Sequence, residues 1–168
     1  TFDTSSGINF SHMFSSIYYD NEPAVRTKII GLDKWDVSNG ENFSNMFEMF
    51  YECSRVTKID VSRFNTSKVT DMRGMFHDCS SLKELDVSNF DITHVTSLSH
   101  MFNICNEDPS GKKYSELEYL DLSKWNTSKI TEADWFLDSL ECVTAEITIR
   151  GKITNYEGMF ESTSKRKG

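Results

Sequence analysis

The feature that most constrains this chain is a segment that recurs along it at a fixed spacing. Ile59-Asp60-Val61-Ser62 is followed after 26 residues by Leu85-Asp86-Val87-Ser88, and a further copy is Leu120-Asp121-Leu122-Ser123. A unit of this size cannot close a hydrophobic core alone, so neighbouring units must stack and share one. We therefore expect the 168 residues to form a single array rather than two unrelated domains.

Three less regular copies extend the array over nearly the whole chain. One contains Ile30-Gly31-Leu32, an earlier one contains Phe10 and Met13, and a shortened last one contains Ile147-Thr148-Ile149, so that Gly31 and Thr148 replace the Asp. We expect one repeat domain over residues 1–160, then a basic tail or linker over residues 161–168. The expected units are about 1–29, 30–55, 56–81, 82–116, 117–142 and 143–160. Because the chain opens part-way through a unit, we expect it to be a fragment of a longer array.

Each unit mixes two hydrophobic periods. Apolar and polar residues alternate over residues 82–87, which predicts a short strand. Apolar residues recur at spacings of three and four over residues 69–79, which predicts a short helix with Thr70 at its cap. A strand and a helix in every unit predict an α/β fold. We expect a right-handed solenoid of about six strand-helix units, with a parallel sheet on one face and short helices on the other.

The most complete unit runs from Leu82 to Cys105 and contains Leu85-Asp86-Val87-Ser88, Phe90, Val95 and Met101-Phe102. This pattern resembles the 26-residue repeat of the BspA-like leucine-rich-repeat family of bacterial surface proteins, with Leu98 in place of one Met. The resemblance covers most of residues 2–160. It implies a leucine-rich-repeat-like solenoid that is displayed outside the cell and that adheres to proteins of a host or a neighbouring cell.

The composition excludes several classes of function. The chain has 26 acidic and 18 basic side chains and a net charge of -8, which disfavours binding to nucleic acid or to an anionic membrane. No motif of a hydrolase, a zinc peptidase or a nucleotide-binding loop occurs, so we expect neither an enzyme nor a cofactor. The four histidines, of which His12 and His100 share a repeat position, are not expected to converge on one site.

Asp60, Asp86 and Asp121 occupy one repeat position, and Glu84 and Glu118 are expected nearby. On adjacent strands these aspartates would form an acidic column that could bind a basic ligand or Ca²⁺. The alternative is that each Asp accepts hydrogen bonds from turn amides or from the Ser two residues later, and is otherwise solvated. We select Asp60, Asp86, Asp121 and Glu84 as candidate ligand-binding residues.

Two insertions interrupt the repeat, and each contains one of the two prolines. One lies between Phe14 and Ile30, and the other lies between Phe102 and Leu120. Both fall on the predicted helix-to-strand connection, so they should emerge along one edge of the array. Loops on a rigid scaffold often carry binding residues, and exposed tyrosines are good interface anchors. We therefore add Tyr18, Tyr19 and Tyr114 to the candidate contact residues, although tolerated length variation also explains the insertions.

Three further repeating columns are expected in the core rather than at a site. Cysteines without close C-x-x-C pairs are expected to be reduced and buried, although a disulfide between neighbouring units is the alternative. Aromatic residues are expected to form a buried spine rather than a surface that stacks bases or sugars. The members are Cys53, Cys79 and Cys105; Phe2, Trp35, Phe64, Phe90 and Trp125; and Met13, Met46, Met75, Met101 and Met159.

These expectations converge on a non-catalytic module for protein–protein interaction at the cell surface. The expected partners are protein ligands, and end-to-end self-association of the array is a further possibility. Two alternatives are a structural stalk or spacer and a Ca²⁺-dependent module that uses Asp60, Asp86 and Asp121. Binding that depends on the insertions would distinguish the first reading from the stalk, and stabilisation by Ca²⁺ would indicate the last.

Overall fold

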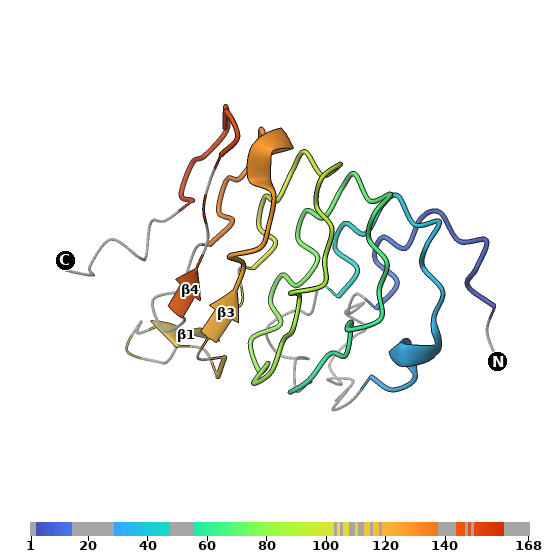
Figure 1. Ribbon diagram of the computed structural model, residues 1–168. Helices are drawn as coiled ribbons and strands as arrows, with labels where there is room; N and C mark the ends of the chain where they lie inside the picture. The colour runs from blue at the N-terminus through green and yellow to red at the C-terminus, as the bar shows by residue number, and fades with distance from the viewer. Residues whose placement is uncertain are drawn as a thin grey trace.

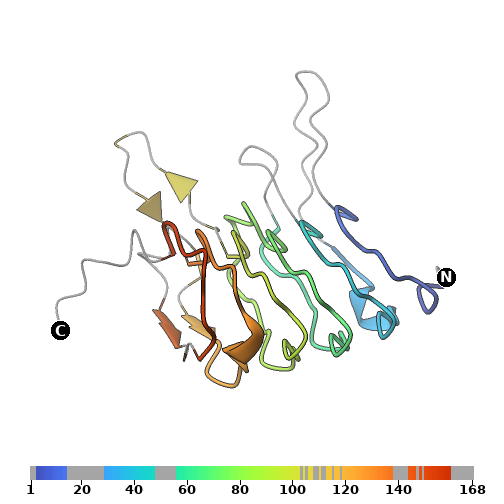
Figure 2. The ribbon, with the colours of Figure 1, turned by 90° about the horizontal axis from the view of Figure 1, so that it is seen from above.

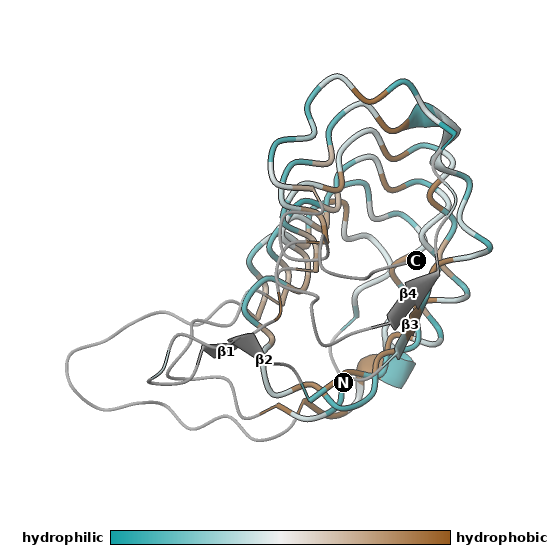
Figure 3. Cartoon of the chain, turned by 90° about the vertical axis from the view of Figure 1, so that its left-hand side faces the viewer, coloured by the Kyte–Doolittle hydropathy of each residue, from teal (hydrophilic) through white to brown (hydrophobic). Residues whose placement is uncertain are grey.

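The computed structural model describes residues 3–14, 29–47, 56–102, 104, 106–107, 110, 113–114, 116–117, 119–137, 144–146, 148 and 150–159. Its units lie side by side in chain order from the N-terminus to the C-terminus (Figures 1 and 2). Viewed from the end of the stack, they lie one behind another (Figure 3). The repeat therefore sets the architecture, as a stack of similar coils.

The regular elements of the described residues are all very short. Two 3₁₀ helices, η1 (Leu32–Lys34) and η2 (Thr127–Lys129), have three residues each. Four strands, β1 (Asn106–Glu107), β2 (Lys113–Tyr114), β3 (Tyr119–Asp121) and β4 (Thr144–Glu146), have two or three. β1 pairs antiparallel with β2 beside the stack, and β3 pairs parallel with β4 (Figure 3).

The predicted α/β solenoid of strand-helix units, with a parallel sheet on one face and short helices on the other, is therefore wrong. The described residues contain no α-helix, and their strands form only two two-stranded sheets. The units are built from turns instead.

Side-chain hydrogen bonds to the backbone explain why turns replace the helices and strands. In one unit the Oδ1 atoms of Asp60, Asn65 and Asp71 accept hydrogen bonds from the backbone N–H two residues later, at 3.2, 3.1 and 3.0 Å. These Asx turns offer the backbone an alternative to regular structure. With such a turn every five or six residues, neither a helix nor a long strand has room to propagate.

The segment predicted as a helix, residues 69–79, shows the same effect. The Met75 N–H donates to the Met72 carbonyl over 3.2 Å, and Gly74 between them has a φ of 58°. A left-handed residue at that position is typical of a type II turn and stops a right-handed helix. Thr70 caps no helix, because its Oγ1 donates to the Glu41 carbonyl of the preceding unit. The equivalent residues of the other units are also left-handed, namely His12, Asn45, His100, Trp135 and Gly158.

Backbone hydrogen bonds join each unit to the next in parallel register. Isolated bridges link one position per unit, in the order Asn9, Asn42, Asp71, Ser97, Glu132 and Asn155. In the last unit the pairing lies two residues earlier than the sequence alignment predicts. Glu146 rather than Thr148 pairs with Asp121, so the register predicted for the last unit is wrong.

A single hydrophobic core runs through the stack. The rings of Phe14, Phe47, Phe76 and Phe102 stack in parallel planes in neighbouring units, with ring centroids 5.3 to 5.8 Å apart. Such aromatic contacts add to the free energy of burial itself.

Most of the predicted core columns are confirmed within the described residues. Phe64, Phe90 and Trp125 are buried, as are Met46, Met75, Met101 and Met159. Trp35 is only partly buried. Met13 is 48% exposed, so its predicted place in the core is wrong, since no preceding coil of the described chain covers it. Cys79 is buried and free, and burial raises the pKa of its thiol, while Phe2, Cys53 and Cys105 lie outside the described residues.

Candidate functional site

The predicted acidic column lies on the outer surface of three consecutive units, and each carboxylate holds its own turn. Asp60 Oδ1 accepts hydrogen bonds from Ser62 Oγ at 2.6 Å and from Ser62 N. Asp86 Oδ1 accepts one from Ser88 N at 3.0 Å, and Asp121 Oδ1 accepts one from Ser123 N at 2.9 Å. The alternative in which each Asp bonds to the Ser two residues later is thus confirmed.

These hydrogen bonds lower the pKa of all three carboxyls below the ordinary value of 3.8, since they stabilise the charged form. Asp60 and Asp86 form no ion pair among the described residues. Each therefore presents a negative charge to solvent and to any ligand that approaches. In the parallel pairing of β3 with β4, Asp121 lies opposite Glu146.

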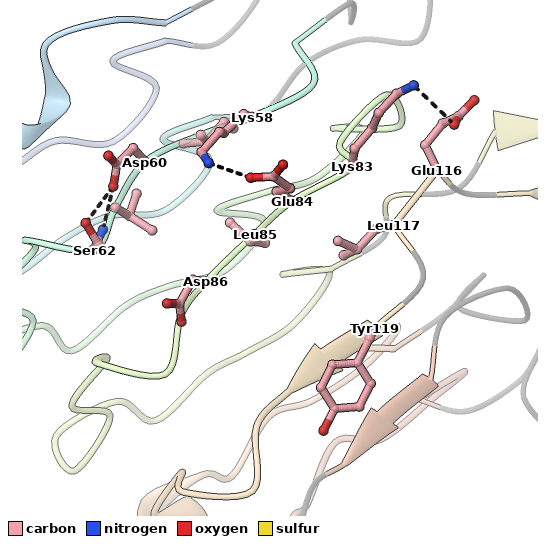
Figure 4. A pocket seen from close by; sticks show the side chains of 12 residues that line it. Lys58, Asp60, Ser62, Lys83, Glu84, Leu85, Asp86, Glu116, Leu117 and Tyr119 are labelled. Atoms are coloured by element: carbon pink, nitrogen blue, oxygen red, sulfur yellow. Dashed lines mark hydrogen bonds and ion pairs between the residues drawn. The ribbon is translucent and has the colours of Figure 1, made fainter.

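A groove of about 850 Å³ lies beside Asp60 and Asp86 (Figure 4). Its charged and aromatic lining comes from three consecutive units. The residues are Lys58, Asp60, Lys83, Glu84, Asp86, Glu116 and Tyr119. Four carboxylates thus face two ammonium groups, which leaves the groove acidic.

Each of the two lysines of this groove forms an ion pair with a Glu of the next unit. Lys58 Nζ donates a hydrogen bond to Glu84 Oε2, which raises the pKa of Lys58. Lys83 Nζ lies 3.7 Å from Glu116 Oε2. Both pairs are exposed, and exposed pairs contribute little to stability. Their effect is to pair Glu84 and Glu116, so Asp60 and Asp86 are the carboxylates of the groove that form no ion pair among the described residues.

The structure brings together only part of the predicted site. Asp60, Glu84 and Asp86 line the groove, whereas Asp121 lies in the next unit outside the lining. Tyr18, Tyr19 and Glu118 lie outside the described residues, so those predictions stay untested. Tyr114 lies in β2, opposite Asn106 of β1, in the second predicted insertion.

Sequence reasoning missed Lys58, Lys83, Glu116 and Tyr119 as lining residues. Lys58, Glu84 and Tyr119 each lie two residues before an Asp of the acidic column. A spacing of two places side chains on the same side of an extended segment, so this pattern was available in the sequence. Tyr119 is 48% exposed and is the aromatic side chain of the groove.

A second polar groove, of about 670 Å³, lies at another corner of the stack. It is lined by His12, His77 and His100, together with Arg73 and Asp134. The ring centroids of His77 and His100 are 5.7 Å apart, so the prediction that the histidines do not converge is wrong for this pair. His12 and His100, which share a repeat position three units apart, line the same groove because the groove runs along the stack.

The charged side chains of this second groove are engaged with their neighbours. Arg73 and Asp71 form a two-point ion pair, which raises the pKa of Arg73. His100 Nε2 lies 3.6 Å from Asp134 Oδ2, and Asp134 Oδ1 accepts hydrogen bonds from Ser99 Oγ and from Asn155 Nδ2. Across the described ranges, no group of three His, Cys, Asp or Glu side chains is arranged to hold a metal ion.

The family model described as Mycoplasma protein of unknown function, DUF285, matches residues 1–48, 15–115 and 46–167. The chain belongs to the DUF285 family. No curated protein matches this DUF285 chain, and no solved structure matches it. Within the described part of this chain, no helix has the length and hydrophobicity needed to span a membrane. The family description assigns no function, so the resemblance to BspA-like surface proteins stays a prediction.

Proposed function

We propose that this chain is a non-catalytic protein-interaction module whose acidic groove binds an extended basic segment of a partner protein. The observation that carries the proposal is the position of Asp60 and Asp86, which form no ion pair among the described residues, in a groove that spans three units. Lys and Arg side chains of a bound segment would pair with these carboxylates. Since the carboxyls have a lowered pKa, they stay ionised throughout the physiological range of pH.

The groove also offers apolar surface to a partner. Tyr119 is half exposed and Leu85 is partly buried, and both line the groove (Figure 4). An aromatic side chain with an accessible ring is the residue type that most often dominates an interface. We propose that Tyr119 anchors the partner, while Asp60 and Asp86 orient it and accelerate its association.

The proposed setting is the surface of a cell, in line with the proposed relation to BspA-like proteins. Several such arrays on one surface would bind a multivalent partner more tightly than one array does, by raising the effective concentration. Adhesion to host or neighbouring-cell proteins is therefore the proposed biological role. The Ca²⁺-dependent alternative is not favoured, because across the described residues no group of three His, Cys, Asp or Glu side chains is arranged to hold a metal ion.

The test is binding of the chain to a panel of immobilised extracellular-matrix and plasma proteins. The variant is Asp60→Asn with Asp86→Asn, since Asn keeps the Asx turn and removes the charge. The matched control is Asp36→Asn with Asp91→Asn, two aspartates that accept the same kind of hydrogen bond outside the groove. We expect saturable binding that the groove variant weakens by about twofold to thirtyfold, as for the loss of two exposed charge pairs.

Added salt should weaken binding by the parent chain more than binding by the groove variant, because salt screens exposed charges. Tyr119→Ala should weaken binding at every salt concentration. Equal loss in the groove variant and its matched control would contradict the proposed surface. An absence of saturable binding by the parent chain would contradict the proposed function and would favour a structural spacer.

A further inference from the structure

The second polar groove runs along the described stack. Its lining residues come from six consecutive units, from His12 in the first to Asn155 in the last. Neighbouring strands lie about 4.8 Å apart, so the five steps between these units give the groove a length of about 24 Å. A groove of this length fits a linear polymer that lies along the stack.

The lining of this groove is polar. Within the described part of the chain it contains no aliphatic side chain and no Phe, Tyr or Trp. It therefore lacks the apolar anchors that dominate most interfaces between proteins. Ser, Asn and His side chains, which can each donate and accept hydrogen bonds, supply most of the lining. The hydroxyls of a sugar also donate and accept, so they match this surface.

The fixed charges of the groove favour a neutral ligand. They belong to Arg73, Glu132 and Asp134. Arg73 is engaged in its two-point ion pair with Asp71, and two carboxylates against one guanidinium disfavour an anionic polymer. The Glu132 side chain is exposed and forms no hydrogen bond among the described residues. Its carboxylate can therefore accept hydrogen bonds from the hydroxyls of a ligand.

Asn45 is the clearest contact residue for such a ligand. It is half-buried in the groove lining, and its side-chain amide forms no hydrogen bond with the rest of the described chain. The amide oxygen lies against Gly74, where a Cβ atom would overlap it. Gly74 thus makes room for an amide that offers two N–H donors and one acceptor oxygen. One such amide can bond to two neighbouring hydroxyls of one sugar.

Packed rings make the wall next to Asn45 rigid. The His77 Cβ atom lies near Gly74 as the Asn45 amide does, and the ring centroids of His77 and His100 are 5.7 Å apart. Trp135 stacks on His100, with ring centroids 6.4 Å apart. A wall that is already packed loses little conformational freedom when a ligand binds. We propose that this groove binds a linear, neutral oligosaccharide, whose hydroxyls bond to the Asn45 amide and to the Glu132 carboxylate.

The test is titration of the chain with four linear hexasaccharides, namely cellohexaose, maltohexaose, mannohexaose and N-acetylchitohexaose. Nuclear magnetic resonance of the ¹⁵N-labelled chain follows the side-chain amide of Asn45, whose signal the variant Asn45→Asp removes and so assigns. We expect at least one hexasaccharide to bind saturably and to shift this signal.

Two substitutions of Asn45 measure its contribution. Asn45→Gly removes the amide and fits the local backbone, because Gly74 and Gly158 occupy the equivalent positions of other units with φ values of 58° and 61°. Asn45→Asp keeps the size of the side chain and removes the N–H donors. Each should weaken binding by about twofold to thirtyfold, as for the loss of one or two hydrogen bonds. The control Asn39→Ala removes an exposed amide outside the groove and should leave binding unchanged.

The variant Asp60→Asn with Asp86→Asn should bind the hexasaccharide as the parent does, so this proposal and the proposed function can fail separately. An absence of saturable binding to all four hexasaccharides would overturn the proposal. Binding that both Asn45 variants leave unchanged would also overturn it, because the sugar would then use another surface. An equal shift of the Asn45 amide signal by a neutral hexapeptide of Gly and Ser would identify a peptide groove instead.

Discussion

At the scale of single residues, two core positions three residues apart in one unit compensate for each other in side-chain volume. A Cβ atom on Gly40 would lie 2.4 Å from Phe43 Cε1, because the phenyl ring fills the space of the missing side chain. In the next unit Val69 stands at the position of Gly40 and Met72 at that of Phe43, and both are buried. The side chains at the two positions fill one space in the core. One unit fills it with Gly and Phe, and the next unit fills it with Val and Met.

This sharing predicts a strong coupling between the two positions. Gly40→Val should lower the free energy of unfolding by about 1–3 kcal/mol, because the added methyl groups overlap the Phe43 ring. Phe43→Met alone should also destabilise, because it leaves a void. The double variant should recover most of the loss, as it recreates the pair found at Val69 and Met72. Urea unfolding of the four proteins measures the coupling, and strictly additive losses would contradict it.

At the scale of elements, the turn replaces the helix and the strand as the structural unit. Asp or Asn followed after two residues by Ser or Thr forms an Asx turn, as in Asp60–Ser62, Asn65–Ser67 and Asp91–Thr93. The apolar spacing of three and four near Met72 and Met75 predicts a helix. A turn with a left-handed residue at Gly74 places the same two methionines in the core. Apolar spacing alone could not separate these structures.

The Asx turns predict a dependence of stability on acid. Hydrogen bonds from the following Ser lower the folded-state pKa of Asp60, Asp86 and Asp121 below 3.8. Their contribution to stability is therefore complete above an unfolded pKa of about 3.9, and it is lost as the pH falls through the lowered folded pKa. Unfolding midpoints in urea should fall over this acidic range.

The control for this prediction is the triple variant Asp60→Asn, Asp86→Asn and Asp121→Asn. Asn can accept the same turn hydrogen bonds but does not titrate, so the variant should lose less stability than the parent on acidification. If the two proteins lost equal stability between neutral and acidic pH, other groups would be responsible for the acid dependence.

At the scale of the whole molecule, stability depends on how each unit contacts its neighbours. The stacked rings of Phe14, Phe47, Phe76 and Phe102 connect four consecutive units. Phe76 is fully buried with a ring on either side, whereas Phe14 lies at the end and is only partly buried. In a stack, a central residue supports two junctions and a terminal residue supports one.

Phe76→Ala should therefore lower the free energy of unfolding by about 3–5 kcal/mol, and Phe14→Ala should cost clearly less. Chemical denaturation followed by circular dichroism measures both losses. Equal losses would show that the ring column does not transmit stability from unit to unit. A second transition in the Phe76→Ala variant would show that the two halves of the stack can unfold separately.

The repeat unit, its repetition and most of the buried columns could be predicted from the order of the residues alone. These features repeat in every unit. Met46, Met75 and Met101 occupy the same position of the repeat, and all three are buried. The Asp–Ser hydrogen bonds were also predictable, since both partners lie two residues apart. Short-range chemistry of this kind does not depend on what the rest of the chain does.

Which residues meet across units could not be predicted in this way, because it depends on how the units stack. The acidic groove joins Lys58, Asp86 and Tyr119, and the second groove joins His77 to His100, because stacking aligns positions that unequal insertions separate in the sequence. Met13 has the same residue type and repeat position as Met46 but is exposed. Its burial depends on a neighbouring coil rather than on its own unit. Contacts between units are set by register and by the presence of a neighbour, and a repeated local pattern specifies neither.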